Sequence, residues 1–258
     1  MCIFSGPVQN VSSTKIFGRA TPAGTQTLVY AMSVLNRRDT AMLLPIPVPP
    51  GSPEETVRFI DLHGYAGFFE DMRRGFRTTP LPASRSFAPQ SLDLTLKVHE
   101  VGDYEASYVP SAADWSRLDP RFRLPGVVFK AVPAYQDYGF AVFKLKASGS
   151  AGRGWLRRRG SGPPRPIHPM AFEFPTRFAG QIFFPTVHVH DGAFHPRADF
   201  DHELYAQYGR TPEGWETSTG PAHGFMDTHR AGEIIEGAAP CYRLEIRGKA
   251  DNRDIIVA

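Results

Sequence analysis

Prolines and glycines divide this chain into short segments along its whole length. It has 24 of each among 258 residues, and both residues interrupt the interiors of helices and strands. Between them lie runs rich in Val, Phe, Leu and Tyr, such as QTLVYAMSVL (26–35) and YGFAVFKLK (138–146), which are typical of β-strands. The pattern predicts an α+β fold, with a mainly antiparallel mixed β-sheet, in one layer or two packed sheets, and three or four short helices.

The length and composition fit one domain over 1–258. A hydrophobic fraction of 41% and an aromatic fraction of 12% supply enough apolar side chains for a substantial core. Two halves, 1–110 and 125–258, share an order of strand, connection and proline-containing strand. Either a loose internal duplication or two packed halves of a β structure would give this order.

Two segments have the spacing of amphipathic helices. Ser52, Pro53 and Glu55 form a capping box, which predicts a helix over 53–62 that resumes over 65–76. A second helix is predicted over 198–208, where Phe200, Leu204 and Tyr208 recur at i, i+4 and i+8.

The C-terminal third is predicted to contain a strand over 181–190 and a long loop over 209–240. The alternating segment CYRLEIRG (241–248) is predicted to be a strand that pairs with DIIVA (254–258).

No apolar run reaches the roughly 20 residues that a membrane-spanning helix needs. The opening MCIFSGPVQN has neither the basic segment nor the apolar segment of a signal peptide. A cytoplasmic protein without a membrane partner is therefore expected.

A basic loop is predicted at 147–168. It holds five arginines and no acidic residue, so the rest of the chain carries a formal net charge of −2 against +3 for the whole. Arg157, Arg158 and Arg159 follow Trp155, and such a group suits anion binding or base stacking in a non-enzymatic binding module. The acidic remainder argues against a nucleic-acid partner, and a surface insertion is the alternative.

The segment VHVHDGAFH (187–195) carries the strongest chemical signal. In a strand His188 and His190 lie on the same face, and two imidazoles at this spacing suit a divalent transition metal such as zinc or iron. Asp191 and His195 follow as further ligands or orienting groups. The alternative is that both histidines lie on a solvated face or form hydrogen bonds under the 209–240 loop.

Further candidate ligands lie on the predicted 198–208 helix. They are Asp199, Asp201 and His202. The sequence thus predicts a metal-binding and hydrolytic protein that acts on a small-molecule or peptide substrate.

The N-terminus offers a second catalytic hypothesis. Removal of Met1 would place a thiol and a free amine on Cys2, as in N-terminal nucleophile hydrolases. MCIF…KIFGR resembles the opening of the choloylglycine hydrolase group of N-terminal-nucleophile amidases, a likeness that implies Cys2 as nucleophile and Arg19 as its assistant. Ala20-Thr21-Pro22 departs from that group, which has Asn-x-Asp here. Cys2 would otherwise be a small buried residue, or join the histidines in a mixed N/S site.

A broader resemblance covers the first two-thirds of the chain. An N-terminal Cys followed by LVYAMSV, AMLLPIPVPPG, YVPS…W and YGFAVFKL is similar in order to a family of uncharacterised, usually exported bacterial proteins. The resemblance implies a mixed β architecture and no particular activity. Those proteins usually have signal peptides, which this opening does not resemble.

Overall fold

The computed structural model describes most of the chain. The described residues are 3–36, 38–76, 99–101, 104–123, 126–145, 165, 166 and 168–258. Cys2 lies outside them, and so do the three arginines at 157–159 of the predicted basic loop.

The strands form two large sheets and a small one. Sheet A has, in spatial order, β1 (Ile3–Phe4), β4 (Thr40–Ile46), β8 (Gly139–Leu145), β7 (Tyr104–Val109) and β6 (His99–Val101). Sheet B has β13 (Glu216–Pro221), β14 (Pro240–Asp251), β12 (Arg197–Gln207), β2 (Asn10–Ala20), β3 (Thr25–Leu35), β10 (Met170–Pro175) and β5 (Arg58–Ile60), with β9 (Arg165–Pro166) beside β3. The third sheet pairs β11 (Ile182–Phe184) with β15 (Ile255–Val257).

The helices are short. The α-helices of the described residues are α1 (Phe68–Arg74), α2 (Gly126–Ala131) and α3 (Thr228–Ala231). The 3₁₀-helices are η1 (Glu54–Thr56), η2 (His63–Tyr65), η3 (Ala112–Arg117), η4 (Pro120–Phe122), η5 (Pro133–Asp137), η6 (Ala222–Gly224) and η7 (Gly232–Ile234). In the described part of the chain no helix has the length and apolar character needed to cross a membrane. The predicted α+β class with few short helices is confirmed.

Each of the two large sheets has a buried inner face, which packs on the other sheet, and a buried outer face. In β3 the alternate residues Leu28 and Tyr30 enter the inner core between the sheets, whereas Val29 and Ala31 face the other way. All of β4 is buried, which explains its unbroken apolar sequence AMLLPI, because a strand covered on both faces has no solvated side.

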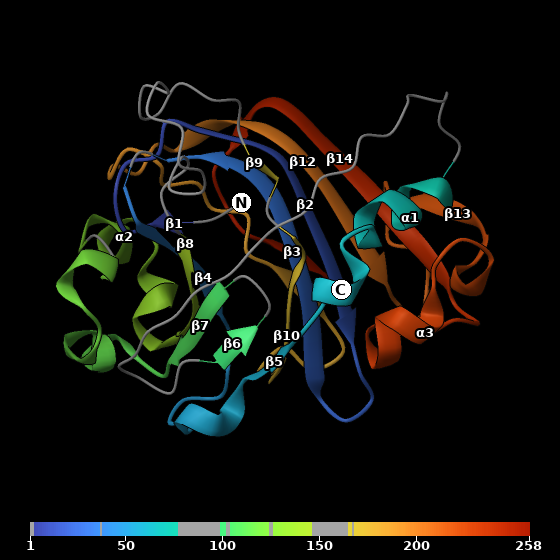
Figure 1. Ribbon diagram of the computed structural model, residues 1–258, viewed down its shortest axis with the longest axis horizontal. Coiled ribbons are helices and arrows are strands. Elements are labelled where there is room, and N and C mark those ends of the chain that lie inside the picture. The colour runs from blue at the N-terminus through green and yellow to red at the C-terminus, as the bar shows by residue number, and fades with distance from the viewer. Residues whose placement is uncertain are drawn as a thin grey trace, which may run out of the picture.

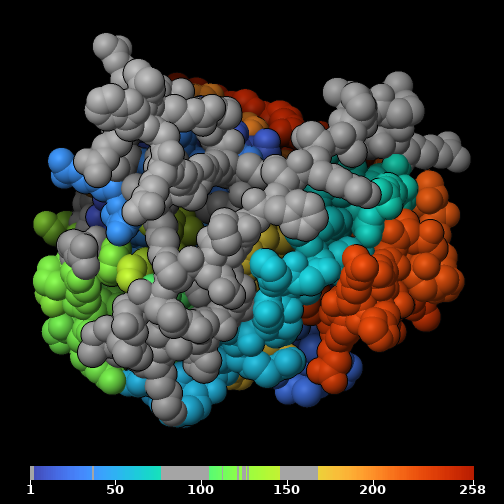
Figure 2. All heavy atoms as spheres, in the orientation of Figure 1, coloured from blue at the N-terminus to red at the C-terminus, as the bar shows by residue number. Residues whose placement is uncertain are grey.

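Helices cover the outer faces. Helices α1 and α3 contribute to a core on sheet B around Phe17, Phe68 and Tyr205. Another core lies on the outer face of sheet A, where Trp115 packs on Phe140. Figure 1 shows α1 and α3 at one flank of the molecule and α2 at the other, and the space-filling view has the same separation of the orange and green segments (Figure 2). The order is therefore helices, sheet B, sheet A, helices.

Both predicted long helices differ from the structure. Over 53–62 the chain forms only η1 before it enters β5, and the capping side-chain bond from Ser52 is not formed; the second part of that prediction survives as α1. The helix predicted over 198–208 is wrong, because these residues form β12. Its apolar residues fit a strand period equally well, and pairing with β2 and β14 decides the outcome.

Two predictions for the C-terminal region are also wrong. The segment 241–248 pairs with β12 and β13, and β15 pairs with β11 instead. The predicted 209–240 loop contains β13, η6, α3 and η7.

Gly18 allows β11 to cross closely over β2. A methyl group at this position would lie 2.6 Å from Ile182 Cγ2 and 3.1 Å from Phe184 Cζ. We expect Gly18→Ala to lower the free energy of unfolding by roughly 1–3 kcal/mol, the usual cost of overpacking, in denaturant titration. Gly220→Ala is the matched control, because this strand glycine has no neighbour within 4 Å of the added carbon. Equal effects of the two substitutions would contradict the close packing of β11 on β2.

Candidate functional site

A pocket of about 260 Å³ opens where β2 and β12 diverge. The two strands run parallel and pair from Thr14 opposite His202 to Arg19 opposite Gln207. Before that point β12 extends back to Arg197 with no backbone pairing to β2. The residues that line the pocket are Val11, Thr14, His188, His190, Asp199, Phe200, Asp201 and His202.

A bulge in β2 shapes the strand edge of the pocket. The pairing register with β3 shifts between Ser12 and Lys15, and Ser13 adopts a φ of 55°, a left-handed conformation that is uncommon outside glycine. The Ser13 N–H donates to Asp201 Oδ2 at 2.7 Å, which satisfies the group that the bulge releases. Bulges redirect side chains, and this one precedes Thr14, a pocket residue that is 1% exposed.

The segment after β11 brings in the predicted histidine pair. Ile3 forms a bridge with Val189, and the Phe4 N–H donates to the Val189 carbonyl at 3.2 Å. Val187 and Val189 pack in the core on the outer face of sheet A, so the alternate residues His188 and His190 face the pocket. His188 and His190 thus face one pocket as predicted, but the predicted strand over 181–190 is wrong beyond Phe184, where β11 ends.

Three imidazole rings form a cluster. The ring centroids of His188 and His190 are 5.2 Å apart, and those of His188 and His202 are 5.0 Å apart. The Phe200 ring lies 4.2 Å from that of His188 and closes the cluster on its apolar side. His202 comes from β12, whereas His188 and His190 lie in the segment that follows β11. The third histidine therefore meets the pair from a different element.

The cluster is buried and polar groups in it lack partners. His202 is 1% exposed and His188 is 9% exposed. His188 Nε2, both ring nitrogens of His202 and Thr14 Oγ1 have no hydrogen-bond partner. Burying such groups unpaired costs free energy, and each unsatisfied group in a native protein calls for an explanation.

Burial also fixes the protonation of the rings. Desolvation lowers the pKa of His188 to about 2 and that of His190 to about 4, and it lowers the pKa of His202 as well. At neutral pH the cluster therefore consists of uncharged imidazoles, each of which has one unprotonated ring nitrogen.

Asp191 and His195 lie apart from this pocket. His195 Nε2 is 2.9 Å from Asp191 Oδ2, and both side chains are 61% exposed. Asp191 Oδ1 also accepts the Ala193 N–H at 2.9 Å. The two residues predicted to complete a metal site thus form a surface turn with each other instead.

The other predicted site residues are separated from the pocket or outside the described residues. Arg19 donates to the carbonyl oxygens of Glu233 and Ile234 and lies five residues beyond Thr14, roughly 16 Å along β2. It ties β2 to η7. Its predicted partner Cys2 lies outside the described residues, as do Arg157, Arg158 and Arg159.

In the described residues, no three His, Cys, Asp or Glu side chains are arranged to hold a metal as they stand. The rings of His188 and His190 are inclined by 33°, and those of His188 and His202 by 32°.

Sequence reasoning placed His202 near the pair but on the wrong element. The segment DFDHELYA also alternates, with Phe200, His202 and Leu204 on one face and acidic residues on the other, and this period of two was the available signal. No sequence pattern marks Thr14 as a pocket residue. The bulge that orients its side chain depends on a hydrogen bond to the carboxylate of Asp201, which is distant in sequence.

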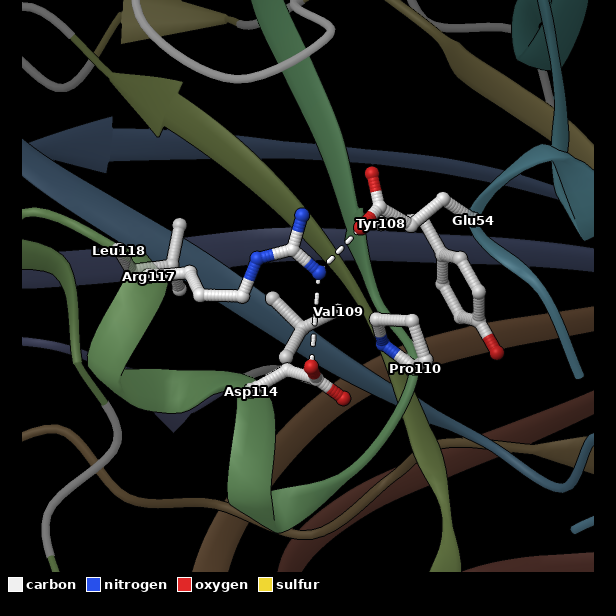
Figure 3. A pocket seen from close by; sticks show the side chains of 7 residues that line it. All are labelled: Glu54, Tyr108, Val109, Pro110, Asp114, Arg117 and Leu118. Carbon is white, nitrogen blue, oxygen red and sulfur yellow. Dashed lines mark hydrogen bonds and ion pairs between the residues drawn. The ribbon is translucent and has the colours of Figure 1, made fainter. Parts of the chain in front are cut away.

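A second, much smaller pocket lies beside sheet A (Figure 3). Its volume of about 10 Å³ has room for about one water molecule. Arg117 extends across it to the carboxylates of Glu54 and Asp114. This ion-paired site is closed by its own residues and offers no open ligand position.

No family model matches the chain. Its backbone is similar to three crystal structures of baculovirus p35. The first is baculovirus p35, which is 12% identical, with 99% of each chain covered and a TM-score of 0.45. A mutated p35 after caspase cleavage is 12% identical, over 95% of this chain and 99% of that one, at 0.43. The caspase-8/p35 complex is 13% identical, over 95% of each, at 0.42. All three TM-scores are below 0.5, so this likeness assigns no function to the chain.

The buried histidines make stability depend on pH. An unfolded histidine takes up a proton below about pH 6.5, whereas the lowered pKa values keep the folded rings neutral. The unfolded state then binds more protons, so the free energy of unfolding falls as the pH drops from about 6.5, by up to about 1.4 kcal/mol per pH unit for each histidine. Denaturant titration in EDTA at pH 7.5 and 5.5 measures this loss.

His202→Leu isolates the contribution of one ring. We expect it to stabilise the metal-free protein by roughly 1–2 kcal/mol at pH 7.5, because it removes a buried polar group without partners, and to reduce the pH dependence. His229→Leu is the control, since His229 is exposed on α3. A His202→Leu variant that is less stable than the wild type and keeps the full pH dependence would contradict this account.

Proposed function

We propose that the protein binds a first-row transition-metal ion through His188, His190 and His202. The observation that carries the proposal is the set of ring nitrogens without partners, on His188 and His202, in a pocket lined by all three histidines. A bound ion would take up nitrogen lone pairs that the folded chain leaves unused.

The chemistry of the pocket favours such an ion. Neutral imidazole is the form that ligates metals, and burial keeps these rings neutral. Nitrogen ligands suit zinc, copper, iron or nickel better than magnesium or calcium. Asp199 and Asp201 also line the pocket, although they alternate with His202 along β12 and Asp201 accepts the Ser13 N–H.

The spacing of the rings is compatible with coordination after a change of ring orientation. A ring nitrogen lies about 1 Å from its centroid and about 2 Å from a bound zinc ion, so two imidazoles in tetrahedral coordination have centroids roughly 5 Å apart. The observed separations are 5.0 and 5.2 Å. A change of side-chain orientation would be the movement required, because the three side chains do not form a metal-holding group as they stand.

Hydrolysis of a small-molecule or peptide substrate is the activity that such a site would support. Three histidine ligands leave one tetrahedral position open, and an ion with an open position lowers the pKa of water. Thr14 Oγ1, buried in the pocket wall without a partner, would hydrogen-bond a water or substrate oxygen there.

Metal binding is tested with the purified, tag-free protein. We expect about one zinc or cobalt ion per chain by elemental mass spectrometry after incubation and dialysis. His188→Gln and His202→Leu are each expected to weaken binding by more than about 100-fold, beyond the effect of losing an outer-shell contact. Because His202→Leu is predicted to be more stable without metal, its loss of binding would not reflect unfolding.

Matched controls separate this site from the alternatives. Asp191→Asn and His195→Gln alter the exposed pair and are expected to bind normally, as is Cys2→Ser if the ligands are the histidines alone. Wild-type protein that holds no metal, or a double His188→Gln, His202→Leu variant that holds a full equivalent, would refute the proposal.

A further inference from the structure

The buried side chain of Asn252 forms its hydrogen bonds with the segment that carries His188. Asn252 is 5% exposed and lies in the turn between β14 and β15. Its Oδ1 accepts the His188 N–H at 2.6 Å, and its Nδ2 donates to the His188 carbonyl at 2.9 Å. The amide thus satisfies both backbone groups of His188, as a neighbouring strand would.

The same residue closes the loop that follows His188. Asn252 Nδ2 also donates to the His195 carbonyl at 2.8 Å, and the Asn252 N–H donates to the Pro196 carbonyl at 2.8 Å. Both ends of the 188–196 loop are therefore held by one residue. The loop contains the exposed Asp191–His195 turn and leads into β12, the strand of His202.

The rest of the turn extends this support. Asp254 Oδ1 accepts the N–H groups of Thr186 and Val187 at 2.8 and 3.1 Å, and the Thr186 hydroxyl donates to the Arg253 carbonyl at 2.6 Å. The turn 252–254 thereby replaces a paired strand along 186–188, where the segment has left β11.

We propose that Asn252 is the positioning residue of the histidine site. It fixes the backbone of His188 so that the imidazole meets that of His202 across the pocket. This inference rests on the proposed metal site, because positioning is defined by the ligand that the rings share. If packing alone held the His188 side chain, it could shift together with its backbone. The two hydrogen bonds from Asn252 to the N–H and carbonyl of His188 instead fix the position and the orientation of that backbone.

Two substitutions of Asn252 retain its size. Asn252→Leu removes all three side-chain hydrogen bonds, and Asn252→Asp keeps the acceptor for the His188 N–H but loses the two donors. We expect both to raise the dissociation constant for cobalt by at least about 10-fold, as outer-shell partners of metal-binding histidines do. The ligand-field absorption of bound cobalt should change as well, since it depends on ligand geometry.

Gln207 supplies a matched control. Its amide bonds the backbone of Glu236 in the same two-sided way, at 2.9 Å to the N–H and 2.8 Å to the carbonyl, and it is 3% exposed. It lies five residues beyond His202 on β12, roughly 16 Å away. Gln207→Leu should lower stability comparably and leave cobalt affinity and absorption unchanged.

The outcomes distinguish the two proposals. Wild-type cobalt binding with unchanged affinity in both folded Asn252 variants would overturn the positioning role and leave the metal site standing. Absence of cobalt binding by the wild type would refute the metal site. Amide hydrogen exchange at His188 tests the positioning without metal: faster exchange in Asn252→Leu than in Gln207→Leu supports it, and equal protection overturns it.

Discussion

The parallel pairing of β2 with β12 holds sheet B together. On one side of this pair lie β3, β10 and β5, and on the other lie β14 and β13. Every other pairing in the sheet is antiparallel. Both strands of the pair are covered on two faces, with Ile16 and Leu204 in the inner core and Phe17 and Tyr205 under α1. The histidine pocket lies at the end where this pairing begins, so its shape follows from where the two strands separate.

Buried polar groups lie where β2 and β12 separate, at positions that apolar side chains could occupy instead. The bulge at Ser13, the hydroxyl of Thr14 and the ring of His202 each violate a local rule of strand or core composition. Elsewhere in the described core, Tyr108 Oη and Trp115 Nε1 also lack hydrogen-bond partners, whereas the unbroken apolar sequence of β4 follows those rules. The exceptions that gather around this one pocket are the feature on which the proposed ligand site rests.

Much of the fold was predictable because it depends on local patterns. Proline and glycine spacing and the strand runs gave the α+β class, and the alternation of VHVH gave the common face of His188 and His190. The errors arose where two periods coincide. Residues 198–208 fit a helix as well as a strand, and only the distant partners β2 and β14 select the strand. The sequence did not predict the structural roles of Asn252 and Asp201, because these roles consist of hydrogen bonds to residues far along the chain.

The pocket is assembled from parts that are distant in sequence. Its lining residues come from the segments 11–14, 188–190 and 199–202, and the turn at 252–254 supports it. Contacts of such long range are slow to form, since the entropy of closing large loops must be overcome first. A ribosome-bound chain therefore contains every histidine well before it has the turn that places them. The site forms only once the segments around Thr14, His188, His202 and Asn252 have come together, so its formation depends on contacts between distant parts of the chain.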